Sequence, residues 1–205
     1  MIHIVDDEEA LRDSLAWLLR SRDIASRPYG SGEAFLAHAR SPLAATAAPG
    51  CVLLDVRMDG MSGIELFERL LGERLCPFWP VVFLTGHGDV PMAVEALKLG
   101  AFDFVEKPFN DNSLVDRLAA ALGESRRRIA EARETARREE RLGSLTARER
   151  EVLELVVEGH YNKVIADRLG VSMRTVEVYR ARIFEKMGVK SAVELARLLG
   201  RRDEP

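Results

Sequence analysis

Five short β-like runs, separated by segments of helical periodicity, place the strongest constraint on the fold of the first half of this 205-residue chain. Continuous apolar stretches among them, such as Val-Val-Phe-Leu at 81–84, are typical of strands buried on both faces of a parallel sheet. Between them, apolar residues recur three or four positions apart, as at Leu11, Leu15 and Leu18. A capping box of Ser62 and Glu65 predicts the start of one helix. The pattern predicts a doubly wound α/β unit with strands at 2–5, 25–29, 51–56, 81–85 and 102–106.

The second half of the chain has helical patterns and no strand pattern. Thr146 and Glu149 form a capping box that predicts a helix from there onward. Further helices are predicted at 162–169, 173–187 and 192–199, with a Gly-Val-Ser turn at 170–172 between the second and third helices. Four short helices with this turn predict an all-α helix-turn-helix domain.

A segment rich in Arg, Glu and Ala separates the two halves. Residues 124–141 contain neither Gly nor Pro and have no continuous apolar stripe, which predicts an exposed helical linker. A coiled coil is the alternative, although apolar heptads are not sustained. We therefore expect three parts: a first domain at 1–122, a linker at 123–143 and a second domain at 144–205.

Charge is distributed unevenly along the chain. Residues 1–124 carry 11 Lys/Arg and 19 Asp/Glu, a net charge of −8. Residues 125–143 carry 7 and 4, a net of +3, and residues 144–205 carry 12 and 10, a net of +2. An acidic first half followed by a mildly basic second half indicates two modules with different partners.

The composition also bears on location. The N-terminus is acidic where an export signal is basic. The longest uncharged apolar stretch, 76–85, is far shorter than the about 20 residues of a membrane span. Cys51 and Cys76 fit buried thiols in a reducing compartment better than a disulfide scaffold. These features predict a cytoplasmic protein that does not enter a membrane.

Polar side chains follow the predicted strands at one end of the sheet. Asp6 and Asp7 follow the first strand, Asp55 ends the third, Thr85 ends the fourth and Lys107 follows the fifth. Functional groups of open parallel sheets gather beyond these carboxyl ends. Three crowded carboxylates need a cation, and Mg²⁺ is the ion that such oxygen ligands favour. The set predicts phosphoryl transfer to Asp55, with the threonine and the lysine binding the product.

The segments that carry these residues closely resemble the receiver domain of bacterial two-component response regulators, in a subgroup similar to the FixJ type. The resemblance covers residues 1 to about 122 and implies a flavodoxin-like (βα)5 fold. Five segments carry it: Ile4-Val-Asp-Asp-Glu, Leu54-Asp-Val-Arg-Met, Gly60-Met-Ser-Gly, Leu84-Thr-Gly-His-Gly-Asp-Val and Gly100-Ala-Phe-Asp-Phe-Val-Glu-Lys-Pro-Phe.

The resemblance implies a role for each residue at the strand ends. Asp55 is the expected phosphoacceptor for a phosphohistidine on a sensor histidine kinase. The implied Mg²⁺ ligands are Asp7, Asp55 and the backbone carbonyl of Arg57, with Asp6 assisting through water. Thr85 and Phe104 match the switch pair, in which the threonine moves toward the phosphoryl group and the ring turns inward. Lys107 matches the phosphate-binding lysine, whose bond to Pro108 is typically cis in this family.

One position departs from the family pattern. The loop after the phosphoacceptor usually contains Met-Pro-Gly, whereas this chain has Met58, Asp59 and Gly60. The backbone at Asp59 is thus free of the proline constraint, and a fourth carboxylate enters the neighbourhood of the metal. Two alternatives stay open: Asp59 alters metal affinity or phosphoryl lifetime, or it points to solvent.

In the second half, the predicted helix at 173–187 has the two faces of a recognition helix. Val176, Ile183 and Met187, with Tyr179 or Arg180, are predicted to face inward. Basic residues at or near this helix outnumber its two acids, which gives the positive charge that phosphate contacts require. Ser172 is a suitable N-cap for the helix.

This half resembles the LuxR/NarL type of helix-turn-helix from about 144 to 199. The segments that carry the resemblance are Leu145-Thr-Ala-Arg-Glu-Arg-Glu-Val-Leu, Gly159-His-Tyr-Asn-Lys-Val-Ile-Ala and Val171-Ser-Met-Arg-Thr-Val-Glu-Val-Tyr. Phosphate contacts are implied for Lys163, Thr175, Arg182 and Lys186, and base-edge contacts for Glu177, Val178 and Ala181, with Arg174 also on the DNA-binding face. A solvated helix face is the alternative for the base-facing residues. The last helix is implied to form a dimer contact.

These features together predict a cytoplasmic response regulator of transcription. Phosphorylation at Asp55 is expected to promote a homodimer that binds double-stranded promoter DNA, with the sensor kinase and RNA polymerase as further partners. No enzymatic activity is expected beyond its own phosphoryl transfer and dephosphorylation. Two rival hypotheses are an aspartyl-phosphate enzyme with a small substrate, for which no cap segment remains, and a DNA binder independent of phosphorylation whose receiver is a scaffold.

Residues outside these motifs are assigned no chemistry. His3, His38 and His160 lack the spacing of metal ligands. Trp17 and Trp79 are expected to serve packing in the core or in loops.

Overall fold

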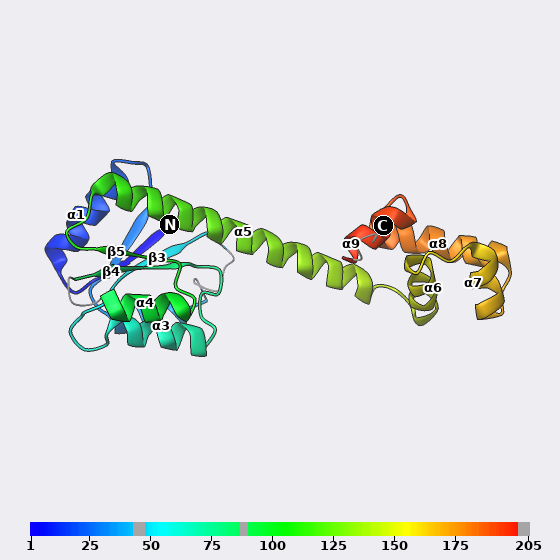
Figure 1. The fold of residues 1–205 in the computed structure, drawn as a ribbon, viewed down its shortest axis with the longest axis horizontal. Helices are drawn as coiled ribbons and strands as arrows, with labels where there is room; N and C mark the ends of the chain where they lie inside the picture. The colour runs from blue at the N-terminus through cyan, green and yellow to red at the C-terminus, as the bar shows by residue number, and fades with distance from the viewer. Residues whose placement is uncertain (43–47, 87–89, 201–205) are drawn as a thin grey trace. The chain divides into compact units, whose positions relative to one another are not determined.

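A computed structural model of the chain describes residues 1–42, 48–86 and 90–200. The chain divides into two compact units, Met1–Glu131 and Ala132–Pro205. The first unit contains a parallel sheet covered by helices, and the described part of the second contains only helices (Figure 1).

The sheet has five parallel strands in the order β2-β1-β3-β4-β5. Every predicted strand is present, and each boundary lies within one residue of its predicted position. A single reversal of strand order beside β1 places the ends of β1 and β3 next to each other, where a doubly wound sheet gathers functional groups. The strands are β1 (Ile2–Val5), β2 (Ser26–Tyr29), β3 (Cys51–Asp55), β4 (Val81–Thr85) and β5 (Asp103–Glu106).

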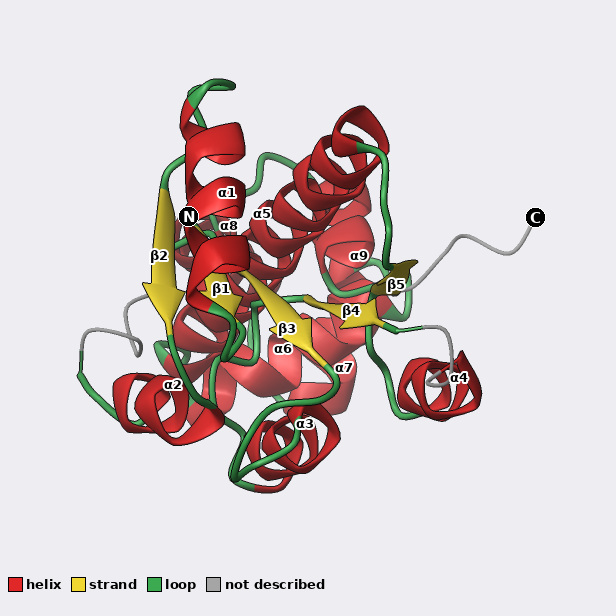
Figure 2. Cartoon of the chain, turned by 90° about the vertical axis from the view of Figure 1, so that its left-hand side faces the viewer, coloured by secondary structure: helices red, strands yellow, loops and turns green. Residues whose placement is uncertain are grey.

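Helices cover both faces of this sheet (Figure 2). On one face, α1 (Glu9–Arg20) and α5 (Asp111–Gly143) pack through leucines such as Leu15 and Leu118. On the other face, α2 (Gly32–Ala39), α3 (Gly63–Gly72) and α4 (Val90–Lys98) pack around Phe35, Phe67 and Phe83. The two apolar layers explain why β1, β3 and β4 lack polar alternation.

The capping box predicted at the start of α3 forms only in part. Ser62 accepts a hydrogen bond from the backbone N–H of Glu65, as an N-cap should. The Glu65 carboxylate instead accepts a hydrogen bond from Arg69 at 2.8 Å. Glu65 therefore pairs with Arg69, one turn along the helix, instead of accepting a hydrogen bond from the backbone N–H of the N-cap residue Ser62.

Helix α5 has 33 residues, so it begins in the first unit, ends in the second and includes the whole segment predicted as a linker. Ser125 and Ile129 within that segment are buried, and the Gly50 N–H donates a hydrogen bond to Ser125 Oγ at 3.1 Å. The expectation of an exposed linker is therefore wrong for this first portion, because it packs on the first unit.

Aromatic side chains pack around a buried histidine in the first unit. The ring of His3 stacks on that of Trp79 with centroids 4.2 Å apart, and its Nδ1 lies 3.1 Å from the Tyr29 hydroxyl. A Cβ at Gly50 would lie 2.7 Å from the Trp79 ring, so only glycine fits there. Packing is thus confirmed for Trp79, whereas Trp17 is 71% exposed on α1 and the same expectation for it is wrong.

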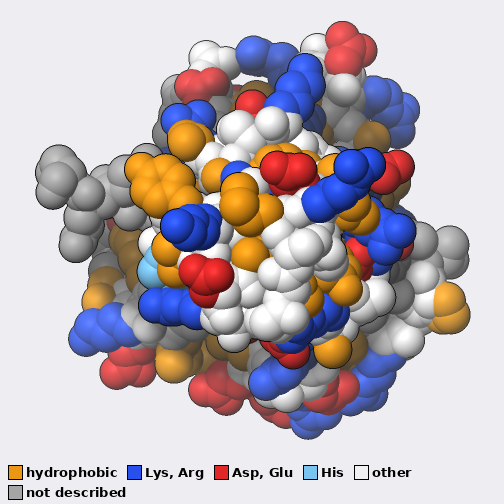
Figure 3. All heavy atoms as spheres, turned by 90° about the vertical axis from the view of Figure 1, so that its right-hand side faces the viewer, with side chains coloured by type: hydrophobic (Ala, Val, Ile, Leu, Met, Phe, Trp, Pro, Cys, Tyr) orange, Lys and Arg blue, Asp and Glu red, His pale blue; other side chains and the backbone are white. Residues whose placement is uncertain are grey.

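The second unit contains α6 (Ala147–Val157), α7 (Asn162–Leu169), α8 (Met173–Met187) and α9 (Ala192–Leu198) around one apolar core. The predicted capping box of Thr146 and Glu149 begins α6. Gly170 ends α7 in the left-handed conformation and turns the chain toward α8. Lys and Arg side chains lie among exposed hydrophobic and uncharged side chains on the face drawn in Figure 3.

No helix among residues 1–42, 48–86 and 90–200 is long and apolar enough to cross a membrane.

Candidate functional site

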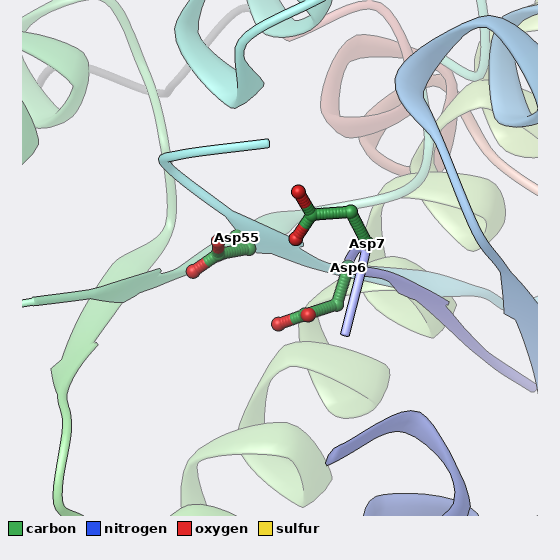
Figure 4. Close-up of side chains that lie close together, drawn as sticks. All are labelled: Asp6, Asp7 and Asp55. Carbon is green, nitrogen blue, oxygen red and sulfur yellow. The ribbon is translucent and has the colours of Figure 1, made fainter. Parts of the chain in front are cut away.

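Three carboxylates converge at the carboxyl ends of β1 and β3 (Figure 4). Asp6 and Asp7 follow β1 directly, and Asp55 is the last residue of β3. One oxygen from each lies within 4.8 Å of the others. Asp6 and Asp55 are buried, whereas Asp7 is exposed, so the cluster opens to solvent on one side.

Backbone groups hold these carboxylates in place. The Glu8 N–H donates to Asp6 Oδ1 at 2.8 Å, and the Asp59 N–H donates to Asp7 Oδ2 at 2.8 Å.

The start of α3 lies so close to the end of β3 that a Cβ at Gly63 would lie 2.0 Å from the backbone oxygen of Asp55. Glycine is therefore required at position 63 for the loop to close.

Lys107 is the cation of the site. Its Nζ donates to Asp55 Oδ1 at 2.7 Å and to Asp6 Oδ2 at 3.1 Å. The backbone of Lys107 is also fixed, because its N–H donates to the Thr85 carbonyl at 2.8 Å. The bond from Lys107 to Pro108 is cis, as the family resemblance implies.

The charges of this site act on each other. Burial raises the pKa of the Asp55 carboxyl, and the charges of Asp6 and Asp7 add to the rise, while Lys107 opposes it. Burial by itself lowers the pKa of Lys107, but hydrogen bonds and charges from Asp55 and Asp6 outweigh it and raise the pKa. Three acids around one lysine leave an excess of negative charge, which suits a further cation.

Thr85 and Phe104 lie on the neighbouring strands β4 and β5, and β4 is next to β3. Thr85 is fully buried at the end of β4, and its Oγ1 has no hydrogen-bond partner among the described residues. Phe104 pairs in register with Phe83 of β4 and is half-buried against the core under α2, α3 and α4. A buried hydroxyl without a partner is unfavourable, so a ligand oxygen would be stabilised there.

The donor set fits magnesium. All three side chains offer carboxylate oxygens, which this hard cation prefers, and they lie close enough to share one ion. Arg57 lies in the loop two residues after Asp55, with its side chain exposed. Asp59 is exposed and contributes its backbone N–H to Asp7, so its carboxylate is not part of the cluster.

The second candidate site is the outer face of α8. Val176, Ile183 and Met187 are buried, as predicted, while Tyr179 and Arg180 are both half-buried. The predicted DNA-facing residues on the opposite side of α8 are exposed. These exposed residues are Arg174, Glu177, Val178, Ala181 and Arg182, together with Lys163 on α7.

Two of the predicted phosphate-contacting residues already have partners within the second unit. Lys186 Nζ donates to the buried carboxylate of Glu149 at 2.6 Å and to the Ser144 carbonyl at 3.0 Å. The hydrogen bond from Lys186 is the largest cause of the lowered pKa of Glu149. Thr175 is half-buried, and its hydroxyl lies 2.8 Å from that of Ser172.

Sequence reasoning missed several residues that shape these sites. The Asp59 amide, the Gly63 contact and the pairing of Lys186 with Glu149 were not predicted. Only the Gly63 contact has a signal in the local sequence, since Gly63 directly follows Ser62, the N-cap of α3. The other two contacts join residues 52 and 37 positions apart in sequence, and no local pattern indicates them.

Two family models match the chain. The response regulator receiver domain matches residues 2–119, and the LuxR family of bacterial regulatory proteins matches residues 143–199. Together the two matches include both candidate sites.

Similar curated proteins cover almost the whole chain. The C4-dicarboxylate transport transcriptional regulatory protein DctR of Rhodobacter capsulatus is 53% identical, over 96% of this chain and 98% of its own. The transcriptional regulatory protein FixJ of Azorhizobium caulinodans is 47% identical, over 96% of this chain and 90% of its own.

Solved structures agree with this assignment. The response regulator StyR matches with a TM-score of 0.87 at 38% identity, over 98% of both chains. Full-length FixJ from B. japonicum matches with a TM-score of 0.59 at 41% identity, over 98% of this chain and 95% of its own. The chain therefore belongs to the response regulators of transcription that carry a receiver domain followed by a LuxR-type DNA-binding domain.

Proposed function

We propose that this protein is a cytoplasmic transcription regulator switched on when a sensor histidine kinase phosphorylates Asp55. The observation that carries the proposal is the convergence of Asp6, Asp7 and Asp55 around the amine of Lys107. The proposed organisation is a receiver at 1–122, a helical linker at 123–143 and a DNA-binding domain at 144–205.

Mg²⁺ is the proposed cofactor. Asp7, Asp55 and the backbone carbonyl of Arg57 would bind it, and Asp6 would act through water. When bound, the ion neutralises phosphoryl oxygens and draws a phosphodonor toward Asp55. The excess negative charge of the cluster supports this role, since Lys107 alone contacts only two of the three carboxylates.

The chemistry at Asp55 is nucleophilic. A carboxylate oxygen of Asp55 forms a bond to the phosphorus atom while the phosphorus–nitrogen bond of the kinase phosphohistidine breaks, and the imidazole leaves. Lys107 then exchanges its hydrogen bond from Asp55 to a phosphoryl oxygen. The hydroxyl of Thr85 donates to another phosphoryl oxygen, which satisfies a group that is buried without a described partner.

The proposed output is dimerisation and promoter binding. Movement of Thr85 toward the phosphoryl group frees space behind it, and Phe104 turns inward on the neighbouring strand. This shifts the receiver between two states and exposes a dimerisation face. A dimer presents two DNA-binding domains to a two-fold-symmetric site in the promoter, beside RNA polymerase.

In the DNA complex, α8 would lie in the major groove. Glu177, Val178 and Ala181 would face base edges, while Arg182 and Lys163 would contact phosphates, with Arg174 at the helix start. Thr175 and Lys186 are also proposed phosphate contacts, and Lys186 would have to share its amine with Glu149. The proposed activity is regulatory, with no catalysis beyond the protein's own phosphoryl transfer and dephosphorylation.

The test measures mass and DNA binding together. Light scattering coupled to size exclusion is run on the wild type, Asp55→Asn and Asp59→Asn, with and without acetyl phosphate and Mg²⁺. We expect the wild type and Asp59→Asn to convert from monomer to dimer and to bind promoter DNA more tightly, while Asp55→Asn does neither. Equal mass and equal DNA affinity for all three proteins under both conditions would show that the receiver is a scaffold.

A further inference from the structure

The first unit contains a cavity of about 290 Å³ that belongs to neither candidate site. It lies between the end of α3, the loop at 74–80 and α5, and all of its lining residues belong to the first unit. Phe67, Leu70 and Trp79 give it an apolar interior. Its volume is at the lower end of small-molecule sites, which run from about 300 to 1,000 Å³.

The charges around the cavity have one sign. Arg74 and Arg128 line it, and none of the described Asp or Glu residues does. The Arg74 guanidinium has no hydrogen-bond or ion-pair partner among the described residues. Arg128 donates from Nε to Glu124 at 2.8 Å, but Glu124 also accepts two hydrogen bonds from Arg127, so one carboxylate serves two cations.

The backbone at Arg74 is unusual for an arginine. The Leu75 N–H donates to the Leu70 carbonyl at 2.8 Å, and the Arg74 N–H donates to the Leu71 carbonyl at 3.1 Å. These two bonds form the Schellman motif that ends a helix, and Arg74 occupies its left-handed position with φ of 53°. Glycine is favoured there because a side chain strains this conformation. The chain thus holds a cation at the cavity where glycine would be the more stable residue.

We propose that this cavity binds a small apolar carboxylate, such as an arylalkanoic acid. The apolar body would fill the space between Phe67, Leu70 and Trp79. The carboxylate would accept hydrogen bonds from Arg74 and from the remaining N–H groups of Arg128, as guanidinium forks favour. The proposal does not depend on phosphorylation of Asp55, which lies at the other end of the strands.

Fluorescence of Trp79 tests the proposal on the full-length protein. The chain has two tryptophans, and replacing the exposed Trp17 by Phe leaves Trp79 as the sole tryptophan. This parent protein is titrated with phenylbutanoate, with the uncharged phenylbutanol and with phenylbutylamine. We expect saturable binding of the acid, at least about fivefold weaker binding of the alcohol and no binding of the amine.

Arg74→Gly is the decisive variant, because glycine suits the left-handed position and the fold is kept. We expect its thermal midpoint to equal or exceed that of the parent, while affinity for phenylbutanoate falls at least about fivefold. Arg20→Gln is the matched control, since Arg20 is an exposed arginine at the end of α1 and does not line the cavity. It should bind as the parent does, and so should Asp55→Asn.

Three results would overturn the proposal. The first is absence of saturable binding. The second is equal affinity for the acid and the alcohol, unchanged by Arg74→Gly. The third is a Trp79 signal that changes with protein concentration in the absence of any ligand, which would identify the cavity as a contact between two copies of the chain.

Discussion

The backbone amide of Asp59 donates a hydrogen bond to Oδ2 of Asp7 across 2.8 Å. Proline, which receivers commonly carry at this position, has no N–H and cannot make this bond. The departure from the family pattern therefore changes the site through the main chain. The exposed carboxylate of Asp59 has no place in the acidic cluster.

Replacing Asp59 by Pro should weaken Mg²⁺ binding by about tenfold, because a hydrogen bond that orients a metal ligand is lost. Asp59→Asn is the matched control, since it keeps the N–H and removes only the charge, and its affinity should equal that of the wild type. Isothermal titration with Mg²⁺ in phosphate-free buffer measures both. If Asp59→Asn weakens binding as much as Asp59→Pro, the carboxylate rather than the amide acts on the metal.

Lys107→Met should destabilise the metal-free protein by about 1–3 kcal/mol, because two buried carboxylates lose a charged hydrogen-bond donor. Added Mg²⁺ should restore a larger share of stability in the variant than in the wild type, since the variant lacks the amine that hydrogen-bonds to both the Asp6 and the Asp55 carboxylate. Urea unfolding with and without Mg²⁺ measures this. An unchanged free energy of unfolding for the metal-free variant would contradict the assigned role of Lys107.

Stability should fall as the pH drops from 7 to 5 because of His3. Burial, followed by the charges of His38, the N-terminus and Arg27, lowers the pKa of folded His3 to about 3, from an unfolded value of 6.5. Below pH 6.5 the unfolded chain takes up a proton that the folded chain does not, so the stability present above 6.5 is lost progressively toward pH 3. The loss from pH 7 to pH 5 should be about 2 kcal/mol.

The pH effect can be assigned with one variant. In His3→Phe the ring still stacks on Trp79 but cannot be protonated, so this protein should lack that part of the pH dependence. Urea unfolding at several pH values between 7 and 5 gives the difference, and the window lies above the range where most carboxylates titrate. Parallel pH profiles for the two proteins would show that His3 is not the group responsible.

Lys186 and Arg182 should behave differently when removed. Arg182→Ala should leave the thermal midpoint unchanged, weaken DNA binding for all sequences and reduce the slope of log affinity against log salt by about one. Lys186→Met should also lower the stability of the DNA-binding domain by about 1–2 kcal/mol, because Glu149 loses its charged donor. Thermal unfolding and fluorescence anisotropy with labelled DNA separate the two effects. Equal thermal midpoints for the two variants would show that the ion pair between Lys186 and Glu149 does not stabilise the domain.

Much of the fold could be predicted because local patterns determine it. Strands β1, β3 and β4 are buried on both faces, so their sequences are mainly apolar. All five strands lie within one residue of their predicted bounds. The capping box of Thr146 and Glu149 lies within four residues and could be seen in the sequence. The acidic cluster was predictable for a topological reason, since parallel strands bring their carboxyl ends together.

What could not be predicted depends on contacts between distant segments. The burial of Ser125 depends on the Gly50 amide, 75 positions away, and nothing in the composition of 124–141 indicates it. The burial of His3 depends on Tyr29 of β2 and on Trp79 in the loop before β4, which lie far from it in sequence. The left-handed backbone of Arg74 is equally hidden, because the sequence shows an arginine where the helix end favours glycine.

Gly63 has a consequence for how this protein can change over generations. The residue has no functional group, yet any side chain at this position would press on the peptide oxygen of the proposed phosphoacceptor itself. A second substitution nearby cannot relieve this clash, because the atom that a side chain at position 63 would meet is a backbone oxygen, which every residue at position 55 has. Under selection for signalling, substitutions at Gly63 should be lost from a population as quickly as substitutions at Asp55.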